Sequence, residues 1–271
     1  MNIHTTSQPP EQVEINGVIV SATPGQKPAL VDGCDTVVGL FQKRCEQLRD
    51  RTAHREKDLG IWQSYSWADY WTHAKWIGLG LRALGLERGE VVSILSEDRK
   101  EWLYADMGIQ CVGGIASGVY TTDSASQLEY LLRDSGSRFL FVENDEQLDK
   151  FLEIEDQASH VVKVIILDQD GLHDLRHDKC VFLDDLYETG RAYEAENHGV
   201  FEEEIKKAKP EDTGLLIYTS GTTGMPKGAM LSQENVIAAC VSGAHALPTM
   251  DKDEQLCFLP LCHILERLVS V

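Results

Sequence analysis

Apolar residues recur at a helical spacing from about residue 35 to residue 84. The first run places them at Val37, Phe41, Cys45 and Leu48. A second run starts after Ser66, and Asp69 stands where a capping box has its acidic partner. Its apolar stripe consists of Trp67, Tyr70, Trp71, Ala74, Ile77, Leu81 and Leu84. Residues three or four apart lie on one face of a helix, so the pattern predicts two helices that pack these stripes into a core.

Beyond Gly85 and Gly89, which end the second helix, short apolar runs alternate with helical segments. Val91–Leu95 is typical of a strand covered on both faces. Further strands are predicted at 118–120, 138–142 and 161–167, and helices at 101–111, 127–132 and 145–152. Strands that alternate with helices form parallel β-α-β units with right-handed crossovers. We therefore predict an α/β fold with mainly parallel sheets covered by helices.

The pattern changes twice more along the chain. From 169 to 212 it is acidic and irregular, and then apolar runs at 214–218 and 229–231 predict strands, followed by a helix that Ser232 caps. We expect a division into an irregular arm (1–34), a first α/β lobe (35–168), an acidic connector (169–212) and the start of a second α/β lobe (213–271).

Composition and charge narrow the class of protein. The chain has 271 residues, of which 42% are hydrophobic, so it can bury a sizeable core. Its net charge of −19 argues against a nucleic acid partner, because phosphate backbones are bound by basic surfaces. The N-terminus is polar, and no apolar run approaches the roughly 20 residues that cross a bilayer. We expect a cytoplasmic protein that could attach peripherally to a membrane. The sequence does not indicate its oligomeric state.

The cysteines indicate neither disulfides nor a metal site. They are odd in number, 7 in all, and irregularly spread, which is typical of reduced thiols. Cys257, Cys262 and His263 are close together, but a fourth ligand with usable spacing is lacking. We predict no metal ligand among them.

The strongest chemical signal is the loop from Tyr218 to Gly228, which we call the phosphate loop. It combines hydroxyls at Thr219, Ser220, Thr222 and Thr223 with glycines at Gly221, Gly224 and Gly228 and one lysine, Lys227. Glycines let backbone N–H groups approach an anion, hydroxyls donate further hydrogen bonds and the ammonium adds a point charge. This composition suits a polyphosphate. A Walker A loop is excluded, because Gly228 follows the lysine where that motif needs a hydroxyl, and a short strand precedes the helix.

The order Y-T-S-G-T-T-G-M-P-K-G closely resembles the phosphate-binding signature of the adenylate-forming (AMP-binding) superfamily, to which the acyl-CoA synthetases belong. Other stretches are similar to segments of those synthetases. Ser96–Trp102 resembles S-x-N-R-x-E-W with Asp98 in place of asparagine, and Leu231–Asn235 resembles L-[ST]-H-x-N with Gln233 in place of histidine. Residues 120–136 and 142–148 are similar to further segments, the latter to one of the long-chain fatty acid–CoA ligases.

A last stretch, Leu259–Arg267, resembles the P-L-x-H-x-x-E-R motif of those long-chain ligases. The resemblance places His263 beside the acyl and adenylate site. For Glu266 and Arg267 two readings stay open: residues of that site, or a structural ion pair.

The resemblance implies ATP-dependent activation of a long-chain fatty acid through an acyl-adenylate to acyl-CoA, with ATP, Mg²⁺ and CoA as substrates or cofactors. It implies that Thr219, Ser220, Gly221, Thr222, Thr223, Gly224 and Lys227 bind the phosphates of ATP, with Lys227, Thr222 and Thr223 also catalytic. Open alternatives are another adenylate-forming ligase (aryl, short-chain or amino acid) and a non-catalytic nucleotide-binding module. A third, a P-loop kinase, is disfavoured by the sequence around Lys227. The superfamily's later motifs are absent, so we expect a catalytically incomplete fragment.

Overall fold

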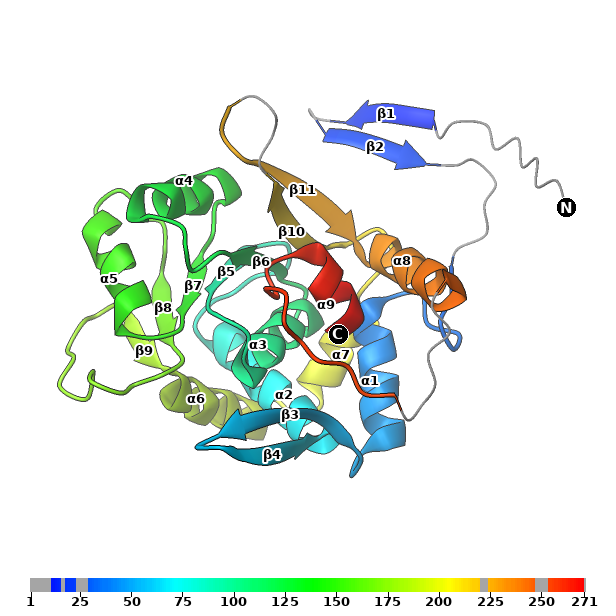
Figure 1. Ribbon diagram of the computed structural model, residues 1–271, viewed down its shortest axis with the longest axis horizontal. Helices are drawn as coiled ribbons and strands as arrows, with labels where there is room; N and C mark the ends of the chain where they lie inside the picture. The colour runs from blue at the N-terminus through cyan, green and yellow to red at the C-terminus, as the bar shows by residue number, and fades with distance from the viewer. Residues whose placement is uncertain (1–10, 16–17, 23–28, 220–223, 247–252, 271) are drawn as a thin grey trace, which may run out of the picture.

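The computed structural model describes residues 11–15, 18–22, 29–219, 224–246 and 253–270. Its centre is a 7-stranded sheet with the order β11-β10-β6-β5-β7-β8-β9 (Figure 1). The strands are β5 (Val91–Leu95), β6 (Ile115–Val119), β7 (Phe139–Val142), β8 (Lys163–Ile166), β9 (Cys180–Phe182), β10 (Thr213–Thr219) and β11 (Lys227–Ser232). All neighbours pair in parallel except β10 and β11, which are antiparallel. The predicted α/β class is confirmed.

Helices cover both faces of this sheet. They are α1 (Val37–Leu48), α2 (Trp67–Ala83), α3 (Lys100–Cys111), α4 (Ala125–Ser135), α5 (Asp145–Ile154), α6 (Leu183–Glu196), α7 (Val200–Lys206), α8 (Gln233–Ala246) and α9 (Ile264–Ser270). Strand β7 shows why its sequence is apolar throughout. Phe139 and Phe141 enter the core that α1, α2 and α3 share, whereas Leu140 and Val142 enter the core under α4 and α5. A strand buried on both faces needs apolar residues at every position.

The two N-terminal helices form as their patterns predict. Ser66 and Asp69 make the expected capping box at the start of α2. Along its stripe Tyr70, Ala74, Ile77 and Leu81 are buried. Small residues then let α2 approach its neighbours closely: a Cβ on Gly190 of α6 would lie 2.0 Å from the carbonyl oxygen of Trp76. Glycine at this position therefore fixes how near α6 can pack against α2.

Three segments differ from the sequence-based expectation. The arm before residue 35 contains a hairpin of β1 (Glu11–Ile15) and β2 (Val18–Ala22). A second hairpin, β3 (Thr52–Asp58) and β4 (Ile61–Ser66), was not predicted, because most of its side chains are polar or exposed. The expected irregular connector holds β9, α6 and α7, because Leu183, Leu186 and Tyr187 give α6 a buried apolar face.

The boundary expected near residues 169–212 does not separate two sheets. Strand β10 lies beyond it in sequence but hydrogen-bonds in parallel with β6, with Leu215 opposite Ala116. The strands on either side of that segment therefore form one continuous sheet. This arrangement brings the phosphate loop to the same sheet edge as the loops that follow β5 and β6.

Candidate active site

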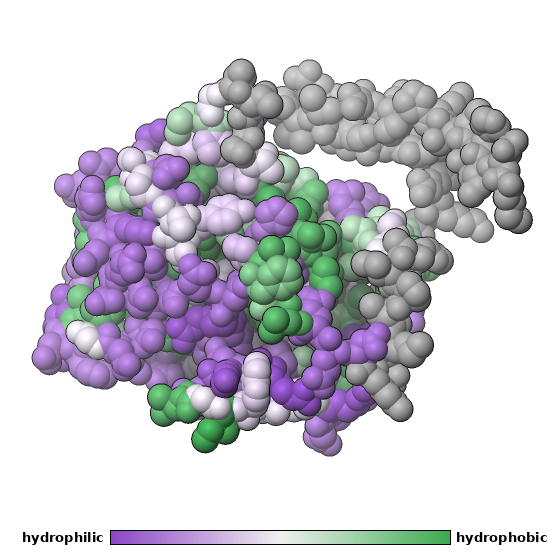
Figure 2. Space-filling model, viewed as in Figure 1, coloured by the Kyte–Doolittle hydropathy of each residue, from purple (hydrophilic) through white to green (hydrophobic). Residues whose placement is uncertain are grey.

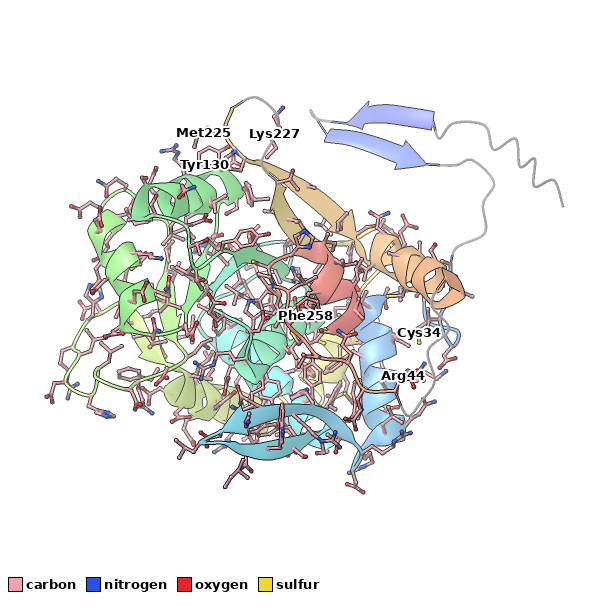
Figure 3. All side chains as sticks on the ribbon, in the orientation of Figure 1. Cys34, Arg44, Tyr130, Met225, Lys227 and Phe258 are labelled. Atoms are coloured by element: carbon pink, nitrogen blue, oxygen red, sulfur yellow. The ribbon has the colours of Figure 1, made fainter. Side chains whose placement is uncertain are left out.

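The phosphate loop connects β10 and β11, and its outermost ladder pair is Thr219 with Lys227. It leaves the carboxyl end of β10, which is the edge of parallel sheets where ligands bind. Gly224 has a φ of +109°, a conformation that favours glycine, and Lys227 is exposed (Figure 3). The predicted residues Ser220, Gly221, Thr222 and Thr223 lie outside the described residues. Their phosphate-binding role stays a prediction, as do those of Thr219, Gly224 and Lys227.

Both stems of the loop are hydrogen-bonded to α4. The hydroxyl of Tyr130 donates to the carbonyl oxygen of Pro226 at 2.8 Å, and the hydroxyl of Tyr218 donates to the carboxylate of Asp134 at 2.8 Å. Burial, together with the hydrogen bond to Asp134, raises the pKa of Tyr218 well above its usual value. The phenol therefore stays protonated and keeps its role as a donor.

Past the loop, Gln233 turns inward from the first turn of α8. It is buried, and its Oε1 accepts hydrogen bonds from the backbone N–H groups of Val37 at 2.8 Å and Val38 at 3.3 Å. Its Nε2 donates to Gln110 of α3 at 3.1 Å. This residue, which replaces the common histidine of the resembled motif, thus ties α8 to both α1 and α3. A Cβ on Gly214 would lie 2.4 Å from the same amide nitrogen, so a side chain at this position would displace the Gln233 amide.

The two motifs that lie far apart in sequence, residues 96–102 and 259–267, are in contact. The carboxylate of Asp98 accepts a hydrogen bond from the backbone N–H of Leu261 at 2.7 Å. Burial raises the pKa of Asp98, although this hydrogen bond lowers it. Close packing against β6 reinforces the contact, because a Cβ on Gly118 would lie 2.6 Å from the Cα of Cys262.

The last motif separates into one exposed residue and two buried ones. His263 is exposed, and its Nδ1 accepts a hydrogen bond from the backbone N–H of Leu265. Glu266 is buried and accepts hydrogen bonds from Gln255, at 3.0 Å, and Ser270, at 2.9 Å. Burial raises the pKa of Glu266, but these hydrogen bonds together bring it below its usual value.

Arg267 forms a buried ion pair, but its partner is Asp106 of α3. Its Nε donates to the Asp106 carboxylate at 3.1 Å, its Nη2 bonds the other carboxylate oxygen, and its guanidinium lies 5.1 Å from the ring centre of Trp102. Arg267 is 2% exposed and Asp106 0%. The idea that Glu266 and Arg267 pair with one another is therefore wrong, since each has other partners.

Sequence reasoning missed Asp106 and Gln110. These two polar residues stand four apart on α3, whose residues from Glu101 to Cys111 are all buried. Gln110 donates to Asp106 at 2.9 Å. A continuous buried chain of polar contacts thus runs from Gln233 through Gln110 and Asp106 to Arg267. The sequence feature that could have revealed them is an aspartate and a glutamine four residues apart within a predicted helix that is otherwise largely apolar.

Apolar side chains are exposed beside this motif. Figure 2 shows apolar surface in the middle of the face where α9 lies. The exposed residues there are Leu256, Phe258, Leu265 and Val269. Apolar surface next to His263 is of a kind that an acyl chain can contact.

The described residues contain no group of three or more His, Cys, Asp or Glu side chains that could hold a metal ion. Among the same residues, no helix has both the length and the apolar character that a membrane span requires.

Comparison with known proteins agrees with the sequence motifs. The family model of the AMP-binding enzymes matches residues 41–271. A long-chain-fatty-acid–CoA ligase of Xenopus laevis (ACSBG2) is 33% identical over 240 residues, which are 87% of this chain and 32% of the relative. A Bos taurus long-chain-fatty-acid–CoA ligase (ACSBG1) is 32% identical, with the same coverage. The chain thus spans about a third of the length of these relatives.

Solved structures share the fold. The Mycobacterium tuberculosis fatty acyl CoA synthetase has a TM-score of 0.69 at 20% identity, over 87% of this chain and 42% of the other. The O-succinylbenzoate Coenzyme A synthetase of Bacillus subtilis, solved in complex with AMP, has a TM-score of 0.60 at 25% identity, over 85% of this chain and 52% of the other. The matched family model covers most of the chain, and the fold agrees. The chain belongs to the AMP-binding enzyme family.

Proposed function

We propose that this chain supplies the phosphate-binding part of an ATP-dependent acid–CoA ligase whose substrate is a long-chain fatty acid. The observation that carries the proposal is the phosphate loop, which retains the family's signature and stands at the carboxyl edge of the sheet. The contact between Asp98 and Leu261 supports it, because it joins the loop after β5 to the motif that resembles an acyl site. The names of the relatives support the class of acid.

The proposed reaction has two steps. The fatty acid carboxylate attacks the α-phosphate of Mg-ATP, which forms an acyl-adenylate and releases pyrophosphate. The thiolate of CoA then attacks the acyl carbon, which forms the thioester and releases AMP. Hydroxyls of Thr219, Ser220, Thr222 and Thr223 would donate to the phosphate oxygens. Backbone N–H groups at Gly221 and Gly224 and the ammonium of Lys227 would complete the phosphate-binding site. Preorganised donors of this kind stabilise charge that develops in the transition state.

The exposed apolar surface beside His263 favours an apolar acid, and the names of the relatives favour a long-chain fatty acid over an aryl or amino acid. A ligase for long acyl chains uses palmitate with a higher kcat/KM than butyrate or benzoate. If butyrate or benzoate were preferred, the long-chain assignment would be refuted, while membership of the family would stand.

The test of the loop is acid-dependent exchange of pyrophosphate into ATP, measured on the complete gene product. Lys227→Ala should lower the exchange rate by roughly 10²–10³-fold, the effect of removing one preorganised donor. Lys57→Ala is the matched control, since Lys57 is an exposed lysine on β3. Equal rates in both variants would refute the loop's role. Binding of Mg-ATP without any acid-dependent exchange would favour the non-catalytic nucleotide-binding module.

A further inference from the structure

Helix α4 contacts the phosphate loop at both of its stems. On one stem, Tyr218 near the end of β10 donates its hydroxyl to Asp134 at 2.8 Å. On the other, the carbonyl oxygen of Pro226, just before β11, accepts the hydroxyl of Tyr130 at 2.8 Å. Figure 3 shows Tyr130 on α4 facing the part of the loop that carries Met225. The helix thus holds the loop from both sides.

The loop needs such a support because of its place in the sheet. Strand β11 is an edge strand whose neighbour in the sheet is β10. Among the described residues, Thr219 with Lys227 is the last ladder pair between β10 and β11 on the side of the loop. Among the residues that the structure describes, the bonds from α4 are the side-chain hydrogen bonds that reach the stems at this end.

Helix α4 is itself rigidly placed, so it can act as a fixed reference. Ser124 and Gln127 form a capping box at its start, and Gly136 ends it with φ at +66°. Its apolar face, which includes Leu128 and Leu132, is buried in the core beneath α4 and α5. The side chains of Tyr130 and Tyr218 are half-buried and pack against that same core. Movement of either hydroxyl is therefore restricted by the packing of its ring.

We propose that Tyr130 and the Tyr218–Asp134 pair are positioning residues, which hold the phosphate loop in the geometry that receives a polyphosphate. The inference rests on the proposed function, because the loop must bind phosphate for its position to matter. It also specifies what Asp134 contributes. A carboxylate near the loop repels an anion, so its contribution is the acceptor oxygen and not the charge. An amide at this position would keep the acceptor without the repulsion.

The first test measures loop order without any ligand. Hydrogen exchange of the peptide that covers residues 219–228 should accelerate by roughly 3- to 10-fold in Tyr130→Phe, the effect of losing one hydrogen bond. Tyr70→Phe is the matched control, because Tyr70 also donates its hydroxyl to a backbone carbonyl, that of Leu103, away from the loop. Unchanged exchange in Tyr130→Phe, or equal acceleration of this peptide in Tyr70→Phe, would overturn the proposal.

The second test measures binding of inorganic pyrophosphate and of Mg-ATP by calorimetry. Tyr130→Phe and Asp134→Ala should weaken binding by roughly 3- to 10-fold, whereas Asp134→Asn should bind as the wild type does or more tightly. The double variant Tyr218→Phe/Asp134→Ala should bind the probes no more weakly than either single variant. Both substitutions remove the same hydrogen bond, the one between Tyr218 and Asp134. Faster exchange with unchanged affinity would show a merely structural contact and overturn the positioning role. If the complete wild-type gene product bound neither probe, the proposed function would be refuted, and the exchange experiment would still decide whether α4 fixes the loop.

Discussion

Removing the guanidinium of Arg267 should strongly destabilise the protein. In Arg267→Met the carboxylate of Asp106, which is 0% exposed, loses both bonds to its ionic partner and keeps only the amide of Gln110. Breaking a buried pair by removing one partner costs about 3–5 kcal/mol, because a buried charge is left without compensation. The loss of the guanidinium beside Trp102 adds to this cost. The expected loss is a large part of the roughly 5–15 kcal/mol that stabilises a typical domain.

The assay is equilibrium unfolding in urea at pH 7, followed by far-UV circular dichroism. If Arg267→Met does not fold, the double variant Asp106→Leu/Arg267→Met decides the question. It removes both charges and should fold with a loss of about 1–2 kcal/mol, mainly because Gln110 loses its acceptor. Arg133→Met is the control, since its pair with Glu129 is exposed and contributes at most about 1 kcal/mol. A cost below about 1 kcal/mol for Arg267→Met, with a less stable double variant, would refute the reasoning.

Three other experiments have definite expected outcomes. Asp98→Asn keeps the acceptor for the N–H of Leu261 and should raise Tm at pH 7. Because burial raises the pKa of Asp98 above its usual value, wild-type stability falls as the pH rises from the usual pKa to the raised one. The variant should lose this dependence in thermal scans from pH 3 to 7. Gly190→Ala should cost several kcal/mol in urea unfolding, because its Cβ would meet the carbonyl oxygen of Trp76 at 2.0 Å; an unaffected variant would contradict the packing of α6 on α2. The 271-residue chain alone, given Mg-ATP, palmitate and CoA, should form no palmitoyl-CoA at ordinary turnover, on the order of 1 s⁻¹, because it spans only about a third of the length of the related ligases. Measured turnover at that rate would contradict this expectation.

Local patterns predicted most of the regular structure. The apolar runs at Val91–Leu95 and 138–142 hold two strands that pair in parallel in the central sheet, and the capping box at Ser66 starts a helix. Both signals are contained in short windows of sequence. The hairpin β3–β4 was missed because its exposed strands lack the alternation that marks a half-buried sheet. Helix α6 was missed because its buried apolar residues are few and stand among many acidic residues in the sequence.

The candidate site was only partly predictable for a different reason. Its loop signature is local, so the sequence alone indicated phosphate binding. The partners of its residues are not local: Gln233 meets Val37 across 196 positions, and Arg267 meets Asp106 across 161. Nothing in the pattern around Arg267 distinguishes Asp106 from Glu266 as its ionic partner. The packing of α9 against α3 determines that Arg267 pairs with Asp106.

The proposed activation of a fatty acid as an adenylate can be tested by product analysis in the absence of CoA. The complete gene product would be incubated with Mg-ATP and palmitate, and the quenched mixture analysed for nucleotides and acyl species. We predict palmitoyl-AMP and pyrophosphate in equal amounts, and conversion of the adenylate to palmitoyl-CoA and AMP when CoA is added. Formation of ADP and inorganic phosphate, with no palmitoyl-AMP, would rule out activation through an acyl-adenylate.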